Sequence, residues 1–237
     1  MQSVLGKLRD GLTGLLLDPR LGKVKKERLT YLSRAKLVRL QQALNDVGIQ
    51  KIEGDHLEFG VAMGGSAVLI AAAAQKRGQN FAGFDVFGMI PPPTSDKDDN
   101  ASKERYSVIA SGASLGLGDD VYYGYRSNLY QDVVDVFVKN GLIVDGRTIK
   151  LVKGLFEETW PHHVSQRIAF CHIDCDWYDP VRYCLNAVRP LLAKGAVVIL
   201  DDYHDYSGCR AATDEFLKEH PLFDVDDGPN LILRLRA

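Results

Sequence analysis

Acidic residues stand directly after two apolar segments of the sequence. His172, Asp174 and Asp176 alternate at the end of the first segment, so a strand there would direct all three to one face. Asp201 and Asp202 are adjacent and follow a run of Val, Ile and Leu. Neighbouring carboxylates repel each other, and a hard divalent cation such as Mg²⁺ or Ca²⁺ relieves that repulsion. If the two segments are neighbouring strands, Asp174, Asp201 and Asp202 converge on a metal site; a helix-capping role for Asp202 is the alternative.

A glycine-rich turn is the second candidate site. Gly60, Gly64, Gly65 and Ser66 lie between an apolar segment that contains Glu58 and an alanine-rich segment. Glycine allows a ligand to approach the backbone closely, and the first N–H groups of a helix are free to bind it. The spacing is neither the G-x-G-x-x-G of a dinucleotide fold nor that of a phosphate loop. The turn therefore indicates either a ligand of another kind or a turn that needs glycine only for packing.

Asp85 follows the next apolar segment, 25 residues after Gly60. In dinucleotide folds an acid about 20 residues after the glycine turn accepts hydrogen bonds from the ribose. Together with the glycine turn, Asp85 indicates a cofactor that contains a ribose. Taken alone, it is equally compatible with an aspartate that caps a loop.

The elements that must position these residues alternate along the chain. Strands are expected at 56–60, 81–86, 148–152, 168–173 and 196–200, with a closing hairpin at 223–225 and 231–235. Helices are expected at 66–77, 128–139, 180–192 and 210–218. This order is typical of an α/β fold with a mainly parallel sheet, here of seven strands, and helices on both faces. Ligands of such sheets bind beyond the carboxyl ends of the strands, where the glycine turn and the acids are expected.

The chain divides into two parts in this interpretation. Residues 1–50 are expected to form an N-terminal helical extension, with an amphipathic helix in 1–17 and leucines at helical spacing between Leu29 and Leu44. Such an extension covers the acceptor site, forms a subunit contact or simply packs on the sheet. Residues 51–237 form the second part, which contains an irregular excursion at 88–118. Loops of this length often act as lids, and a solvated surface loop is the alternative.

Composition excludes several classes of protein. Lys and Arg total 29 and Asp and Glu total 31, so the net charge of −2 provides no electrostatic footprint for nucleic acid or for an anionic membrane surface. The longest apolar run, at 67–74, is far shorter than the roughly 20 residues that span a bilayer. The four cysteines show no disulfide framework, so we expect reduced thiols in a cytoplasmic protein.

The order of these motifs resembles that of the macrocin O-methyltransferase family. The resemblance rests on EFGV and GGS within 58–66, GFD at 83–85, KGLFEET at 153–159, HIDCD at 172–176 and DDY at 201–203. It implies a Rossmann-like class I methyltransferase fold and an enzyme that depends on S-adenosylmethionine (SAM) and Mg²⁺. The acceptor implied is a sugar hydroxyl on a natural product. The sequence departs from the family at Val86, where related enzymes usually have Ser, and this affects the details of the cofactor lid.

The resemblance also implies a role for each motif. The glycine turn would hold the methionine part of SAM, Asp85 its ribose, and the segment after the third strand its adenine. Asp174 would contact the cofactor, help to bind the metal and take the proton from the substrate hydroxyl. The cofactor-binding residues implied are Glu58, Gly60, Val61, Gly64, Gly65, Ser66, Asp85, Gly154, Phe156 and Asp174, and the metal ligands are Asp174, Asp201 and Asp202.

Three other functions use part of the same pattern. A methyltransferase of catechol-type phenols would need a similar metal site, whereas a non-catalytic SAM-binding protein would have no use for three acids. A nicotinamide-dependent reductase would require a different glycine spacing and a Tyr-x-x-x-Lys pair. His204, two residues after the acid pair, would contact substrate, act as a base or be a surface histidine. The partners expected are a small hydroxyl-bearing substrate and further copies of the same chain in a homo-oligomer.

Overall fold

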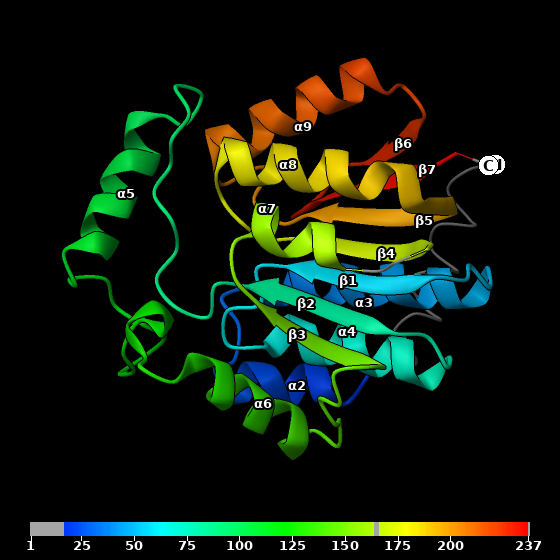
Figure 1. Cartoon of the computed structure of the whole chain (residues 1–237), viewed down its shortest axis with the longest axis horizontal. Coiled ribbons are helices and arrows are strands. Elements are labelled where there is room, and N and C mark those ends of the chain that lie inside the picture. The colour runs from blue at the N-terminus through cyan, green and yellow to red at the C-terminus, as the bar shows by residue number, and fades with distance from the viewer. Residues whose placement is uncertain (1–16, 164–165, 237) are drawn as a thin grey trace.

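A mainly parallel sheet of seven strands forms the centre of the protein (Figure 1). The computed structural model describes residues 17–163 and 166–236. The strand order is β3-β2-β1-β4-β5-β7-β6, and β7 runs in the direction opposite to the other six strands. The prediction of seven strands in a mainly parallel sheet is confirmed. The strands are β1 (Asp55–Phe59), β2 (Phe81–Asp85), β3 (Ile149–Lys153), β4 (Ile168–Ile173), β5 (Leu192–Leu200), β6 (Phe223–Asp226) and β7 (Leu231–Leu235).

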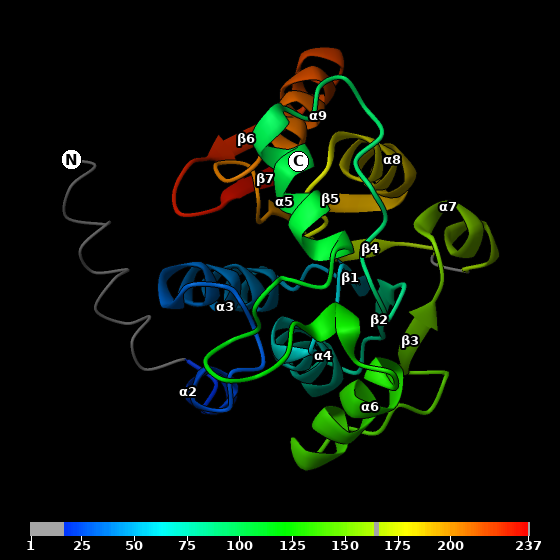
Figure 2. The same cartoon turned by 90° about the vertical axis from the view of Figure 1, so that its left-hand side faces the viewer.

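Helices cover both faces of the sheet, and the central strands are therefore buried on both faces. Every residue of β4 is buried, because alternate side chains enter the two hydrophobic layers: Phe170 belongs to one core cluster, and Cys171 and Ile173 belong to the other. Figure 2 shows α3 and α4 on one side of β1 and β4, and α8 on the other. The first layer contains α2 (Arg20–Lys26), α3 (Arg34–Ile49), α4 (Gly65–Lys76) and α6 (Leu129–Lys139), and the second contains α8 (Tyr178–Val188) and α9 (Ser207–Glu219).

The N-terminal region contributes α2 and α3 to the first layer. Ser33 caps α3, since its side chain accepts a hydrogen bond from the backbone N–H of Lys36. Leu37, Leu40 and Leu44 are buried on one side of the helix against the same core as α4. The helix expected in 1–17 lies outside the described residues, and the division of the chain at residue 50 stays a prediction.

Two predicted boundaries after β4 are wrong by several residues. The helix expected at 180–192 begins at Tyr178 and ends at Val188. Pro190 has no N–H to continue the helical bonding, so the chain passes through one 3₁₀ turn, Arg189–Leu191. β5 then begins at Leu192, four residues before the expected start.

The excursion at 88–118 is not irregular throughout, and this corrects the prediction. It contains α5 (Asn100–Ala110), whose N-cap Asp99 accepts a hydrogen bond from the N–H of Ser102. Asp99 belongs to the charged run at 96–99, which was interpreted as part of a loop, so this cap was not predicted. Only Ser102 and Ile109 of the helix are buried. α5 stands apart from the sheet, beyond the carboxyl ends of its strands (Figures 1 and 2). Among the described residues, none of the helices combines the length and apolar character needed to cross a membrane.

Candidate active site

A cavity of about 680 Å³ opens at the carboxyl ends of the strands. This volume lies within the range of small-molecule sites. Eight of the residues predicted to bind the cofactor or the metal line it: Gly60, Val61, Ser66, Asp85, Phe156, Asp174, Asp201 and Asp202. Four others do not contribute to its lining: Glu58, Gly64, Gly65 and Gly154.

The glycine turn after β1 packs tightly against neighbouring backbone. Gly60 has a φ of +91°, and a Cβ there would lie 1.8 Å from the carbonyl oxygen of Asp174. A Cβ on Gly65 would lie 2.4 Å from the carbonyl oxygen of Leu29, which accepts the N–H of Gly65 at 2.9 Å. Glycine at position 60 therefore allows the backbone after β1 to contact the backbone after β4. Glycine at position 65 allows the segment at Leu29 to pack against the start of α4.

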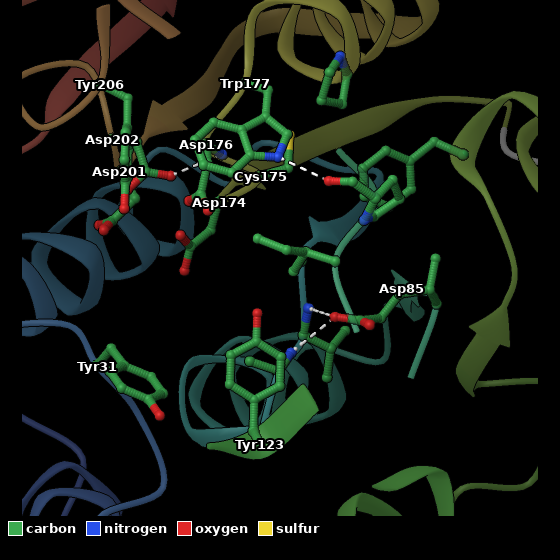
Figure 3. Close-up of a pocket in the computed structure, with 18 of the residues that line it drawn as sticks. Tyr31, Asp85, Tyr123, Asp174, Cys175, Asp176, Trp177, Asp201, Asp202 and Tyr206 are labelled. Atoms are coloured by element: carbon green, nitrogen blue, oxygen red, sulfur yellow. Dashed lines mark hydrogen bonds between the residues drawn. The ribbon is translucent and has the colours of Figure 1, made fainter. Parts of the chain in front are cut away.

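Asp85 lies at the end of β2 and bonds to the backbone around the turn (Figure 3). Its Oδ2 accepts the N–H groups of Val61 and Ala62 at 2.8 and 2.9 Å, and its Oδ1 accepts the N–H of Phe87 at 2.6 Å. Burial raises the pKa of Asp85, although these three N–H groups act in the opposite direction. Ala62 and Phe87 have positive φ values of 46° and 47°, so the chain bends around this carboxylate on both sides.

The acids after β4 and β5 meet on the opposite wall of the cavity (Figure 3). Ile173 and Leu200 are paired in the parallel sheet, so the residues that follow them leave the sheet side by side. Asp174, Asp176 and Asp202 each offer one oxygen, and these oxygens lie within 4.8 Å of one another. Asp174 and Asp202 were predicted metal ligands, whereas Asp176 was not.

Burial raises the proton affinity of all three acids. Burial, followed by the charges of Asp202 and Asp201, raises the pKa of Asp174 well above its ordinary value. Burial also raises the pKa of Asp202, and in Asp176 it raises the pKa to about 6. Oxygen donors with this surplus of negative charge suit a hard divalent cation.

Asp201 lies beside this group, but its oxygens face other residues. Its Oδ2 accepts from Nζ of Lys36 at 2.8 Å, and its Oδ1 accepts from the side-chain amide of Asn230 at 3.3 Å. Nε2 of His172 is 3.7 Å from the same Oδ1. Burial alone would raise the pKa of Asp201, but His172 and Lys36 outweigh it and lower the pKa.

Glu58 and His172 form a buried pair behind the cavity wall. They face each other across β1 and β4, and Oε1 of Glu58 lies 2.8 Å from Nδ1 of His172. Both side chains are fully buried. Burial would lower the pKa of His172, but the neighbouring Asp201 and Glu58 side chains outweigh burial and raise it to about 10.

Aromatic side chains form the outer part of the cavity and were not predicted. Tyr31 and Tyr123 are in edge contact, with ring centroids 5.8 Å apart, and Trp177 and Tyr206 are in edge contact at 5.1 Å. Arg105 of α5 also lines the cavity. The run YYGY at 122–125 was the available signal in the sequence, since adjacent tyrosines in a glycine-rich segment are unusual for a solvated loop.

His204 belongs to the surface near the cavity. Its Nε2 lies 2.8 Å from Oδ1 of Asp227, and neither residue lines the cavity. The described geometry therefore agrees with the surface alternative for this histidine.

Comparisons with known proteins identify the family to which this site belongs. The model of the family described as Macrocin-O-methyltransferase (TylF) matches residues 25–227. The 8-demethyl-8-(2,3-dimethoxy-alpha-L-rhamnosyl)-tetracenomycin-C 4'-O-methyltransferase of Streptomyces olivaceus is 25% identical over 209 residues, with 83% of this chain and 72% of that protein covered. The O-methyltransferase NovP has a similar solved structure, with a TM-score of 0.74, 20% identity, and coverage of 97% of this chain and 100% of that chain. TomG from Streptomyces achromogenes, solved in complex with SAM, has a TM-score of 0.56 at 13% identity, with 98% and 96% of the two chains covered. The chain therefore belongs to the macrocin O-methyltransferase family.

Proposed function

We propose that this protein is a SAM-dependent O-methyltransferase that uses a divalent cation, Mg²⁺, to methylate a sugar hydroxyl of a natural product. One observation carries the proposal. A single cavity has the glycine turn and Asp85 on one wall, and Asp174, Asp176 and Asp202 on the other. The first wall suits a nucleoside-bearing methyl donor, and the second suits a cation and the hydroxyl that it activates.

The cofactor would lie along the turn after β1. Gly60 and Val61 border the cavity there, and Asp85 and Phe156 border it further along. Phe156 is in edge contact with Phe59, at 5.3 Å between centroids, and this contact orients its ring beside the proposed adenine position. The related fold of TomG was solved with SAM, which supports this cofactor for the present chain.

The acid group fits a hard cation. Three carboxylate oxygens within 4.8 Å of one another are donors of the type that Mg²⁺ accepts, and burial raises the pKa of each of the three carboxyls. Asp174 and Asp202 would hold the ion, with Asp201 or Asp176 as a third ligand. When bound, the ion supplies electrostatic stabilisation to the alkoxide that develops as the hydroxyl loses its proton.

A carboxylate of the same group would accept that proton. Asp174 is buried beside Asp202 and Asp201, so its affinity for a proton is high. Asp176 is the second candidate, because burial raises its pKa to about 6, close to the range in which a general base works well. The methyl group of SAM is already electrophilic and needs no further activation. Holding it in line with the acceptor hydroxyl therefore contributes most of the remaining rate acceleration.

The acceptor proposed is a glycosylated natural product. The S. olivaceus relative is named for a rhamnosyl substrate, and the aromatic outer wall offers apolar faces on which a sugar or an aglycone packs. A catechol-type phenol is the second candidate, because the same metal group would serve an aromatic hydroxyl.

Calorimetric titration tests the cofactor site first. S-adenosylhomocysteine is titrated into the metal-free protein, then into the protein with Mg²⁺, and then into Asp85→Ala. Binding to the first two and loss of binding in the variant support the proposal, whereas absence of heat in both metal states overturns it. Transfer of labelled methyl from SAM to a panel of rhamnosides and catechols, with Mg²⁺ or with EDTA, then separates the two acceptor classes.

A further inference from the structure

Lys36 brings the N-terminal region into the acidic wall of the cavity. Its Nζ donates to the carbonyl oxygen of Asp201 at 2.9 Å, to Oδ2 of Asp201 at 2.8 Å and to Oδ2 of Asp205 at 2.6 Å. Its side chain is only 13% exposed. An ammonium group has three protons, so these three contacts use its whole hydrogen-bonding capacity.

The residues that Lys36 contacts are the two ends of the turn that carries Asp202. Asp201 leaves β5 with its N–H bonded to Ile173, and the N–H of Asp205 bonds back to the carbonyl of Asp202 at 3.0 Å. Lys36 therefore joins both ends of a five-residue turn from outside the turn. Oδ2 of Asp202, in the middle, accepts the N–H of Asp176 at 3.2 Å.

α3 places Lys36 rigidly. The side chain of Ser33 caps the helix by accepting the N–H of Lys36, and Leu37 and Leu40 are completely buried in the core. The anchor and the acidic turn are 165 residues apart in the sequence, so this contact exists only because α3 packs on the sheet.

Lys36 also divides the acids of the wall into two sets. Asp201 is paired with Lys36, whereas Asp174, Asp176 and Asp202 each direct one oxygen to a common centre. The Lys36 contact thus keeps one carboxylate out of a repulsive group and leaves the others facing a common centre.

We propose that Lys36 is a positioning residue for the metal group: it holds the Asp201–Asp205 turn, and through it Asp202, in the geometry that receives the divalent cation. This inference rests on the proposed function, because the turn is positioned for a metal only if a metal binds there. Hydrogen-bond partners of metal ligands commonly change affinity about 10–100-fold when they are removed.

The test measures Mn²⁺ binding, followed by the loss of the free-ion EPR signal, in the full chain saturated with S-adenosylhomocysteine. Lys36→Met removes the ammonium but keeps the length of the side chain. We expect it to weaken Mn²⁺ binding about 10–100-fold, with S-adenosylhomocysteine affinity close to that of the unchanged protein. Lys36→Arg, which keeps the charge and the donors, recovers most of the Mn²⁺ affinity.

Lys23→Met is the matched control. Lys23 lies on α2 and also donates to a distant carbonyl, that of Lys139, but it does not line the cavity. It should leave Mn²⁺ affinity unchanged. Asp205→Asn removes one of the two carboxylates that bind Lys36 and serves if Lys36→Met fails to fold; we expect a smaller loss of Mn²⁺ affinity in the same direction.

The outcomes separate this inference from the proposed function. If the unchanged protein binds S-adenosylhomocysteine but no Mn²⁺, both the metal part of the proposed function and the role of Lys36 are overturned. If the unchanged protein binds Mn²⁺ and Lys36→Met binds it equally well, only the role of Lys36 is overturned. Tighter Mn²⁺ binding by Lys36→Met also overturns it, because Lys36 would then act as a competing cation.

Discussion

The two walls of the cavity satisfy their charges in opposite ways. On the glycine-turn wall, Asp85 is surrounded by three backbone N–H donors, so its charge is balanced by the fold itself. On the acidic wall, Asp174, Asp176 and Asp202 face one another, and no lysine, arginine or histidine in the described part of the chain forms an ion pair with any of them. The backbone N–H groups thus balance the charge of the first wall, whereas the second keeps a surplus of negative charge that the proposed cation would balance. In the proposed function, the first wall binds the cofactor through a turn fixed by backbone hydrogen bonds, and the second carries the reacting side chains.

The largest loss of activity should follow from removing a carboxylate of the acidic wall. Asp174→Asn removes the proposed base and one metal donor, and we expect kcat to fall about 10²–10⁴-fold. Methyl transfer at saturating SAM and Mg²⁺ measures this. Asp224→Asn is the control, since Asp224 pairs with Arg236 on the distant edge of the sheet. Unchanged turnover in Asp174→Asn would show that the acidic wall is not where the reaction occurs.

The glycine-turn wall should respond in stability as well as in binding. Asp85→Ala leaves the N–H groups of Val61, Ala62 and Phe87 without their acceptor. Each unsatisfied buried donor costs about 1–3 kcal/mol, so we expect the free energy of unfolding to fall by about 3 kcal/mol or more. Urea denaturation measures this loss. Asp85→Asn keeps one acceptor oxygen and should lose less; equal stability of all three proteins would contradict a wall balanced by its own backbone.

The acidic wall should give the metal-free protein a distinctive dependence on pH. Burial raises the pKa of Asp176 to about 6, so the folded state binds its proton more tightly than the unfolded state does. The stability contributed by this group is therefore present below about pH 4, the ordinary range of an aspartate, and is lost as the pH rises to about 6. Melting temperatures in EDTA, measured from pH 4 to 7 for the unchanged protein and for Asp176→Asn, should show a smaller decrease in the variant.

Mg²⁺ should reverse this trend, because a bound cation favours the ionised carboxylates. At about one hundred times its Kd, a ligand adds about 2.7 kcal/mol to the stability. We expect the increase in melting temperature on adding Mg²⁺ to be larger at pH 7 than at pH 5. The same increase at both values would mean that the three acids do not hold the ion.

The smallest effect concerns the segment that borders both walls. The indole Nε1–H of Trp177 donates to the carbonyl of Pro91 at 3.0 Å and ties the start of the excursion to α8. Trp177→Phe removes this bond, and we expect a loss of about 0.5–1.5 kcal/mol in local stability. Faster hydrogen exchange of the amides at 94–99, with little change in turnover, would support this; unchanged exchange would show that other contacts hold the segment.

The sequence by itself determined the order of the elements and the edge of the sheet at which the site lies. The apolar segments and the helical spacing are local signals, and in an alternating α/β chain they allow few arrangements. They predicted all seven strands and the meeting of Asp174 with Asp202. They also predicted that Asp85 lies at the cavity wall, although its contact with a ribose stays a prediction.

Only the tertiary structure decided which side chains pair. Glu58, expected near the cofactor, pairs with His172 because β1 and β4 are neighbours with these residues in register. Asp201, expected among the metal ligands, has its Oδ2 bonded to Lys36, and one oxygen of Asp176 lies close to those of Asp174 and Asp202. The identity of the third metal ligand stays a prediction. These pairings depend on contacts between distant segments. A buried charged group is stable only when a partner compensates it, and the packing of those segments decides which partner lies close enough. No local pattern in the sequence records that choice.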